Sequence, residues 1–141
     1  MKNRTLAIIK PDAVQSNYTG LIYDRILKNK FKILCAKLIK MTKKQAEGFY
    51  LIHKEKPFYD ELTSFMSSNP CMVLALEKDL AVSEWRKAIG STNPKDAKSG
   101  TLRKDFAKNL SQNAVHGSDS DENAQKEIAF FFSDSELISN Q

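Results

Sequence analysis

Four short apolar runs, each followed by a stretch with helical spacing or helix caps, constrain the fold of this chain more than any other feature. The runs are RTLAIIK at 4–10, FKILCAKLIKM at 31–41, CMVLALEK at 71–78 and a brief one at 115–117. Short runs rich in apolar and β-branched residues predict buried strands. We therefore expect strands and helices to alternate four times along the chain. This order is typical of an α+β sandwich of the split βαβ type.

Polar caps mark where several of the predicted helices begin. Thr42 followed three residues later by Gln45 matches a capping box, so a helix is expected to begin there and run toward His53. Ser83 and Ser120 are expected to cap two later helices. The helical spacing and turn residues predict further helices near 21–27, 57–66 and 104–109, with a long loop over 90–102.

Length and composition favour one domain spanning residues 1–141. The N-terminus has no secretory apolar region, and the longest apolar run, CMVLAL at 71–76, is too short to span a bilayer. Cys35 and Cys71 lie far apart in apolar stretches without metal-ligand spacing, which predicts reduced core or edge residues. We therefore expect a cytoplasmic protein with no membrane segment, in which only the tail 135–141 is disordered.

His116 is one of only two histidines and stands between a small apolar pair and a polar run that begins a helix. An imidazole can serve as nucleophile, acid or base, metal ligand or structural side chain, and the pattern alone leaves structure and chemistry evenly matched. No second histidine or cysteine lies at ligand spacing, so a metal site is not expected. His53 lies in a lysine-rich helix end, where a solvated or capping role is expected.

Basic residues near turns indicate a phosphate site, and the net charge of +5 favours an anionic partner. Lys10 ends the first apolar run, and Arg86 and Arg103 flank the loop that contains Thr92. Arginine forks grip phosphate oxygens, and a threonine hydroxyl adds a donor. The patterns GxxxxGK[ST] and GxGxxG are absent, which excludes the common nucleotide-binding motifs. These residues predict a phosphate site built around a histidine.

Phe58 and Leu62 lie one helical turn apart, and the pattern favours core packing over a clamp for a flat base. Tyr50 is equally compatible with the core and with the site. From the residues alone, the reaction stays open. A basic ferredoxin-like module that binds nucleic acid is the alternative, although no strand carries an RNP-like run of aromatic residues.

Three segments resemble the nucleoside diphosphate kinase family. They are TLAIIKPDAV at 5–14, STNPKDAKSGTLRKDF at 91–106 and NAVHGSDS at 113–120, and the resemblance covers nearly the whole chain. With the element order, it implies a ferredoxin-like (βαββαβ) sandwich with a four-stranded antiparallel sheet and covering helices. It also implies transfer of the γ-phosphate of ATP or another nucleoside triphosphate to a nucleoside diphosphate, by a ping-pong mechanism through phosphohistidine.

The resemblance assigns roles to individual residues of this sequence. His116 would be the nucleophile that becomes phosphohistidine. Nucleotide-binding roles would fall to Lys10, Phe58, Arg86, Thr92, Arg103 and Asn113. Supporting roles would fall to Tyr50, Leu62, Ser118 and Glu127, with Glu127 accepting a hydrogen bond from the second ring nitrogen. Gly117 is expected to leave room for the terminal phosphate. Mg²⁺ would arrive bridging the nucleotide phosphates and not in a protein cage.

The expected partners follow from the same resemblance. They are nucleoside tri- and diphosphates with little base preference, and further copies of the chain in a homo-tetramer or hexamer. Neither a membrane nor nucleic acid is expected as the main partner. Asn17 and Asn69 replace glycines usual in the family, and Ser99 replaces a common proline. Asparagine tolerates the left-handed conformation, so the turn at Asn69 is expected to survive.

Overall fold

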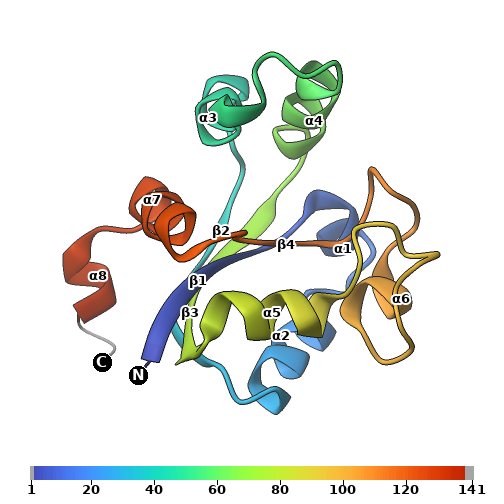
Figure 1. Cartoon of the computed structure of the whole chain (residues 1–141). Coiled ribbons are helices and arrows are strands. Elements are labelled where there is room, and N and C mark those ends of the chain that lie inside the picture. Colours follow the sequence, from blue (N-terminus) through green and yellow to red (C-terminus); the bar gives the residue numbers. More distant parts are fainter. Residues whose placement is uncertain (1, 139–141) are drawn as a thin grey trace.

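The computed structural model describes residues 2–138 and consists of a sheet with helices on both faces (Figure 1). In chain order the elements are β1 (Lys2–Ile9), α1 (Pro11–Gln15), α2 (Thr19–Lys28), β2 (Lys32–Ile39), α3 (Lys43–Phe49), the 3₁₀ turn η1 (Leu51–His53), α4 (Tyr59–Met66), β3 (Cys71–Asp79), α5 (Ala81–Ile89), α6 (Leu102–Phe106), β4 (Val115–Gly117), α7 (Asp121–Phe131) and α8 (Asp134–Ile138).

The four strands form an antiparallel sheet in the order β2-β3-β1-β4. The central strand β1 pairs with β3 along its whole length and with β4 over three residues, where Ile8 lies opposite His116. The predicted fold class, a ferredoxin-like sandwich with a four-stranded antiparallel sheet, is confirmed. Its consequence for the site is that the short edge strand carrying His116 rests on the most buried strand of the sheet.

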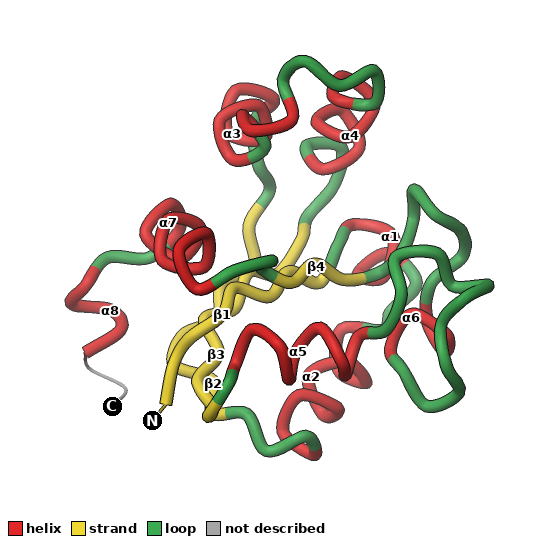
Figure 2. Tube along the Cα trace, in the orientation of Figure 1, coloured by secondary structure: helices red, strands yellow, loops and turns green. Residues whose placement is uncertain are grey.

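Alternating side chains of β1 divide the core into two layers, as expected for a strand buried on both faces. Leu6 and Ile8 pack with residues of α3, α4, α7 and α8, whereas Ala7 and Ile9 pack with residues of α1, α2, α5 and α6. Figure 2 shows the same division, with the sheet running between the two groups of helices. Each helix therefore covers one defined face. The ends of β1 and β2 and the starts of β3 and β4 lie at the same end of the sheet.

The predicted caps were correct at two of three helices. Thr42 and Gln45 form the capping box at α3, and the Ser120 hydroxyl accepts from Asn123 at the start of α7. Ser83 was wrong as a cap, because α5 already begins at Ala81. Its N-cap is Leu80 in the left-handed conformation with φ 56°.

Other local predictions were incomplete or wrong. The five-residue helix α1, which begins at Pro11, was not predicted, and α6 begins two residues earlier than expected. Helix α8 occupies part of the tail expected to be disordered, whereas residues 139–141 lie outside the described residues. The left-handed conformation is adopted by Asn17 (φ 64°) and not by Asn69.

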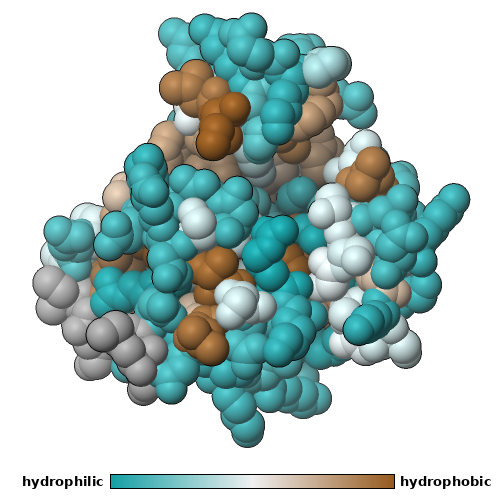
Figure 3. Space-filling view, viewed as in Figure 1, coloured by the Kyte–Doolittle hydropathy of each residue, from teal (hydrophilic) through white to brown (hydrophobic). Residues whose placement is uncertain are grey.

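The surface in Figure 3 is mainly hydrophilic, with apolar groups over the α3–α4 hairpin and near the centre of this face. Between those two helices, η1 exposes Leu51 and Ile52. Both cysteines are free, and Cys71 is buried as expected. No helix within residues 2–138 has the length and apolar character needed to cross a membrane.

Candidate active site

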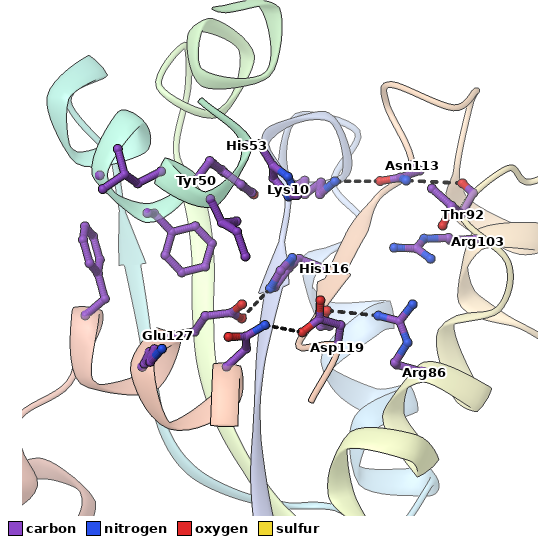
Figure 4. A pocket seen from close by; sticks show the side chains of 18 residues that line it. Lys10, Tyr50, His53, Arg86, Thr92, Arg103, Asn113, His116, Asp119 and Glu127 are labelled. Atoms are coloured by element: carbon purple, nitrogen blue, oxygen red, sulfur yellow. Dashed lines mark hydrogen bonds and ion pairs between the residues drawn. The ribbon is translucent and has the colours of Figure 1, made fainter. Parts of the chain in front are cut away.

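Most of the predicted site residues line one cavity of about 840 Å³ at the end of the sheet where β1 and β4 meet the helices (Figure 4). Its lining includes Lys10 after β1, Tyr50 after α3, Arg86 from α5, Thr92 from the long loop, Arg103 from α6, Asn113 and His116 around β4, and Glu127 from α7. Segments separated by more than a hundred residues thus build a single pocket.

The backbone before His116 is held in an unusual conformation by the segment that follows β1. Ala114 has φ 72°, a left-handed value that is costly for a residue with a Cβ. Its carbonyl accepts from the Lys10 amide at 2.8 Å, and its amide donates to the Asp12 carboxylate at 3.1 Å. These two bonds fix the turn that leads into β4.

The imidazole of His116 is oriented through one of its two nitrogens. Nε2 lies 2.8 Å from Oε1 of Glu127, and the Ser118 hydroxyl donates to the same oxygen at 2.8 Å. The Ser118 oxygen in turn accepts from the Leu6 amide of β1 at 3.1 Å. A carboxylate acceptor at Nε2 selects the tautomer with its proton on Nε2. Nδ1 is therefore left with a free electron pair.

Burial lowers the pKa of His116, and this effect exceeds the opposing influence of Glu127. Lys10 and Arg103 lower the pKa further. The ring is consequently neutral over more of the physiological pH range than a solvated imidazole. A neutral, oriented imidazole with one free nitrogen is suited to nucleophilic attack.

Lys10 is a buried cation held by the predicted asparagine. Its ammonium donates to the Asn113 side-chain oxygen at 2.8 Å, and the Asn113 amide donates to the Thr92 carbonyl at 3.2 Å. Burial and the nearby Arg103 lower the pKa of Lys10 to about 8, although the Asp12 carboxylate acts in the opposite direction. An anion in the cavity would restore the missing counter-charge.

Two arginines complete the positive wall. Arg103 is buried and donates to the carbonyls of Gly90 and Val115, both at 2.9 Å. Its Nε is buried and has no partner among the described residues. Burial and neighbouring Arg86 lower the pKa of Arg103 to about 10. Cations crowded together at this cost indicate a site shaped for a highly charged anion.

A second cavity, of about 400 Å³, adjoins the first, because Lys10 and Thr92 line both. Phe58, Leu62 and Leu110 form apolar parts of its wall, and Phe58 is 46% exposed. The pattern-based preference for core packing was therefore wrong for Phe58. Leu62 both lines this cavity and packs against the core.

Tyr50 and His53 both line the first cavity. Tyr50 is buried, its ring meets the His116 ring edge-on with centroids 6.4 Å apart, and its hydroxyl has no partner among the described residues. Burial raises the pKa of Tyr50, so it stays a neutral donor. His53 stacks on Tyr50 at 6.4 Å and contacts Phe58 at 5.6 Å. His53 was expected to be solvated or to cap a helix. The residue is partly exposed, its Nδ1 is buried, and it lines the first cavity.

Sequence reasoning missed four residues around the site: Asp12, His53, Leu110 and Asp119. Asp12 lies two residues after Lys10, and Asp119 lies three residues after His116. Their closeness in sequence to these two predicted site residues could have identified them. The Asp119 carboxylate lines the cavity and accepts from Asn123 at 2.6 Å, which lowers its pKa. Leu110 carried no signal, because it becomes part of a wall only when the loop folds over the second cavity.

The structure also changes the interpretation of Gly117. A Cβ at this position would lie 2.7 Å from the Trp85 ring and 3.2 Å from Ile89. The missing side chain therefore makes room for a helix on the side of β4 that faces α5. The expectation that it makes room for a phosphate was wrong, although the Gly117 backbone does line the cavity.

Comparisons with known proteins show which family the chain resembles along its length. The family model described as nucleoside diphosphate kinase matches residues 3–137. The chain is 55% identical over 135 residues to the nucleoside diphosphate kinase of Geotalea uraniireducens, covering 96% of this chain and 98% of that protein.

Solved structures give the same picture. The Aquifex aeolicus nucleoside diphosphate kinase superposes with a TM-score of 0.95 at 39% identity, covering 97% of this chain and 99% of that one. The Halobacterium salinarum nucleoside diphosphate kinase in complex with CDP gives 0.92 at 35% identity, covering 97% and 91%. These similarities do not support the nucleic-acid-binding alternative.

Proposed function

The chain belongs to the nucleoside diphosphate kinase family, and we propose that it transfers phosphate through a phosphohistidine intermediate on His116. It is a phosphotransferase that acts on nucleotides. The observation that carries the proposed mechanism is the bond between His116 Nε2 and Glu127, which leaves Nδ1 free at the cavity.

In the first half-reaction, Nδ1 of His116 attacks the γ-phosphorus of a nucleoside triphosphate. The Nδ1–P bond forms, the bond from phosphorus to the β,γ-bridging oxygen breaks, and the nucleoside diphosphate leaves with that electron pair. The imidazole gains positive character, which the Glu127 carboxylate at Nε2 stabilises. In the second half-reaction, a terminal oxygen of another diphosphate attacks the same phosphorus and frees Nδ1.

Lys10, Arg86 and Arg103 bind and neutralise the phosphates in this scheme. Phosphoryl transfer depends mainly on positioning and on stabilising charge over the phosphate oxygens, and buried cations do both. The Arg103 Nε and the Tyr50 hydroxyl are buried beside this positive wall and have no partner among the described residues. Thr92 and Asn113 hold the lysine side of the pocket.

The second cavity receives the base in this proposal. Phe58 supplies an exposed aromatic face, and Leu62 and Leu110 supply apolar walls. Stacking is available to every base, because every base has a π-face. We therefore expect the enzyme to accept adenine, guanine and pyrimidine nucleotides, in ribose and deoxyribose forms.

Magnesium would bind at this site together with the nucleotide and not as a resident ion of the protein. Within the described residues no group of three or more histidine, cysteine or acidic side chains could hold a metal ion. Mg²⁺ commonly binds through one or two carboxylates together with substrate phosphates, and the Asp119 carboxylate at the cavity suits that donor set. When bound, the ion would neutralise phosphate charge.

Three further proposals concern the whole protein. We infer that residues 1–141 act as one domain, which the family match over 3–137 supports. We also infer a homo-oligomer, tetramer or hexamer, because that assembly is implied by the resemblance to the family. A cytoplasmic location is proposed from the nucleotide substrates that such an enzyme needs.

Labelling tests the mechanism directly. Incubation with γ-labelled ATP should place acid-labile phosphate on His116, and added GDP or CDP should remove it. His116→Asn should abolish the label. His53→Asn is the matched control, since His53 is the only other histidine of the sequence and should leave the covalent label in place. A His116→Asn protein that labels like the wild type would refute the proposal.

A further inference from the structure

Trp85 connects helix α5 directly to the backbone of His116. Its side chain is fully buried, and the indole Nε1–H donates to the His116 carbonyl oxygen at 3.0 Å. It is the only tryptophan of the sequence. A tryptophan on the inner face of a helix is usually explained by core packing alone, but this bond reaches the residue that carries the nucleophilic ring.

The packing around the indole leaves it little freedom. On one side the ring meets Phe31 edge-on, with centroids 5.6 Å apart and planes at 84°. On the other side it occupies the space that a Cβ of Gly117 would need, at 2.7 Å from that position. The indole is therefore wedged between the α5 face of the core and the strand, so its N–H has a fixed direction.

Arg86, the next residue of α5, makes a parallel contact. Its Nη1 lies 3.5 Å from the carbonyl oxygen of Gly117, the residue after His116. Two consecutive residues of the helix thus donate hydrogen bonds to two consecutive backbone carbonyls of β4. This arrangement connects a phosphate-binding guanidinium and the imidazole to the same short stretch of backbone.

Strand β4 needs such support more than the other strands. It has three residues and pairs only with β1, at the edge of the sheet. It also follows the strained Ala114. Without the indole N–H, the part-buried carbonyl of His116 would lose its partner on the α5 side, and the strand would be free to shift.

We propose that Trp85 is a positioning residue for phosphoryl transfer, which holds the His116 backbone at a fixed place relative to Arg86. This inference rests on the proposed function, because it assumes His116 as the phosphorylated residue. It predicts that the indole N–H contributes to the rate of the chemical step more than to nucleotide affinity, since misplacing a nucleophile affects the transition state first.

The first test compares Trp85→Phe with Phe31→Leu. Trp85→Phe keeps an aromatic ring in the core but removes the N–H, whereas Phe31→Leu disturbs the same core and keeps the bond to His116. Trp85→Phe should slow single-turnover phosphorylation by ATP roughly 10-fold. Its dissociation constant for ADP should change less than about twofold. Phe31→Leu should lower thermal stability and leave the phosphorylation rate near the wild-type value.

Two outcomes of this comparison overturn the inference. One is a folded Trp85→Phe protein that phosphorylates at the wild-type rate. The other is equal slowing in both variants, which would mean that core packing alone matters. If wild-type protein carries no phosphate on His116, the proposed function fails instead, so the two failures are distinguishable.

A second test uses wild-type protein and stays informative if Trp85→Phe does not fold. The sequence has one tryptophan, so its indole N–H gives a single assignable NMR resonance. Phosphorylation with ATP, followed by removal of nucleotide, should shift this resonance, because charge on the imidazole polarises the backbone to which the indole donates. His116→Asn treated identically should show no shift. An unchanged resonance in fully phosphorylated wild-type protein contradicts the proposal.

Discussion

We expect Lys10 and His116 to limit the proposed reaction at opposite ends of the pH range. The pKa of His116 lies below its ordinary 6.5, so the neutral, nucleophilic ring is lost only as the pH falls through that lowered value. The pKa of Lys10 is lowered to about 8, so its positive charge is lost as the pH rises through about 8. We expect kcat/KM of the free enzyme to be bell-shaped between these limits.

Asp12 offers a sharp test of the alkaline limb. Its carboxylate raises the pKa of Lys10, so Asp12→Asn should move the fall in kcat/KM to lower pH. Asparagine keeps an oxygen that can accept from the Ala114 amide, whereas Asp12→Ala removes both charge and acceptor. The pH dependence of kcat/KM for ATP, the substrate that meets the unphosphorylated enzyme, measured for all three proteins, checks this. An unshifted limb in Asp12→Asn would show that Lys10 does not set it.

At the residue scale, the sequence predicted the charged groups better than their surroundings. Lys10, Arg103 and His116 stand in recognisable segments, and the structure brings them together. The roles of His53 and Trp85 depend on contacts made only after folding. His53 enters the cavity because η1 turns back between α3 and α4, and Trp85 meets a carbonyl 31 positions later in the chain.

The N-termini of some helices could be predicted from residue type, whereas those of others could not. The caps at Thr42 and Ser120 were predicted because a hydroxyl that accepts a backbone amide is a local chemical device. The start of α5 has no local cap: Leu80 is left-handed, and the Ala81 amide donates to the side-chain oxygen of the distant Asn3. Likewise, α1 is only five residues long, and its first residue, Pro11, resembled the end of a strand.

The cap of α7 gives a prediction at this scale. Ser120→Ala removes the acceptor for the Asn123 amide and should lower the free energy of unfolding by about 1 kcal/mol. Ser120→Asp, which keeps an acceptor and suits a helix N-terminus, should retain most of the stability. Urea unfolding of the three proteins measures the difference. Equal midpoints and slopes for the alanine variant and the wild type would contradict the assigned cap.

At the scale of the molecule, the fold class followed from the four apolar runs, but the order of the strands did not. β3 is apolar on both faces and lies inside the sheet, whereas the residues of β2 alternate in exposure at the edge. The position of the three-residue β4 beside β1 depends on pairing across more than a hundred residues, which no local pattern contains.

The site joins parts of the chain that are distant in sequence, so a nucleotide should act as a cross-link. ADP at about 100 times its dissociation constant should raise the free energy of unfolding by about 2.7 kcal/mol. Adenosine at the same concentration should stabilise far less, because it offers nothing to Lys10, Arg86 or Arg103. Denaturant unfolding with each ligand measures this. Equal stabilisation by adenosine and ADP would argue against the phosphate site.

The two cavities meet at Lys10 and Thr92, and this junction has a consequence for the cell. In the proposed mechanism, donor and acceptor nucleotides bind the same site in turn, and between these two binding events the protein carries only a phosphate on His116. The phosphorylated protein is therefore the same, whichever base the donor nucleotide carried. We therefore expect the enzyme to exchange phosphate among the nucleotide pools of the cell until the ratio of triphosphate to diphosphate is the same in all of them.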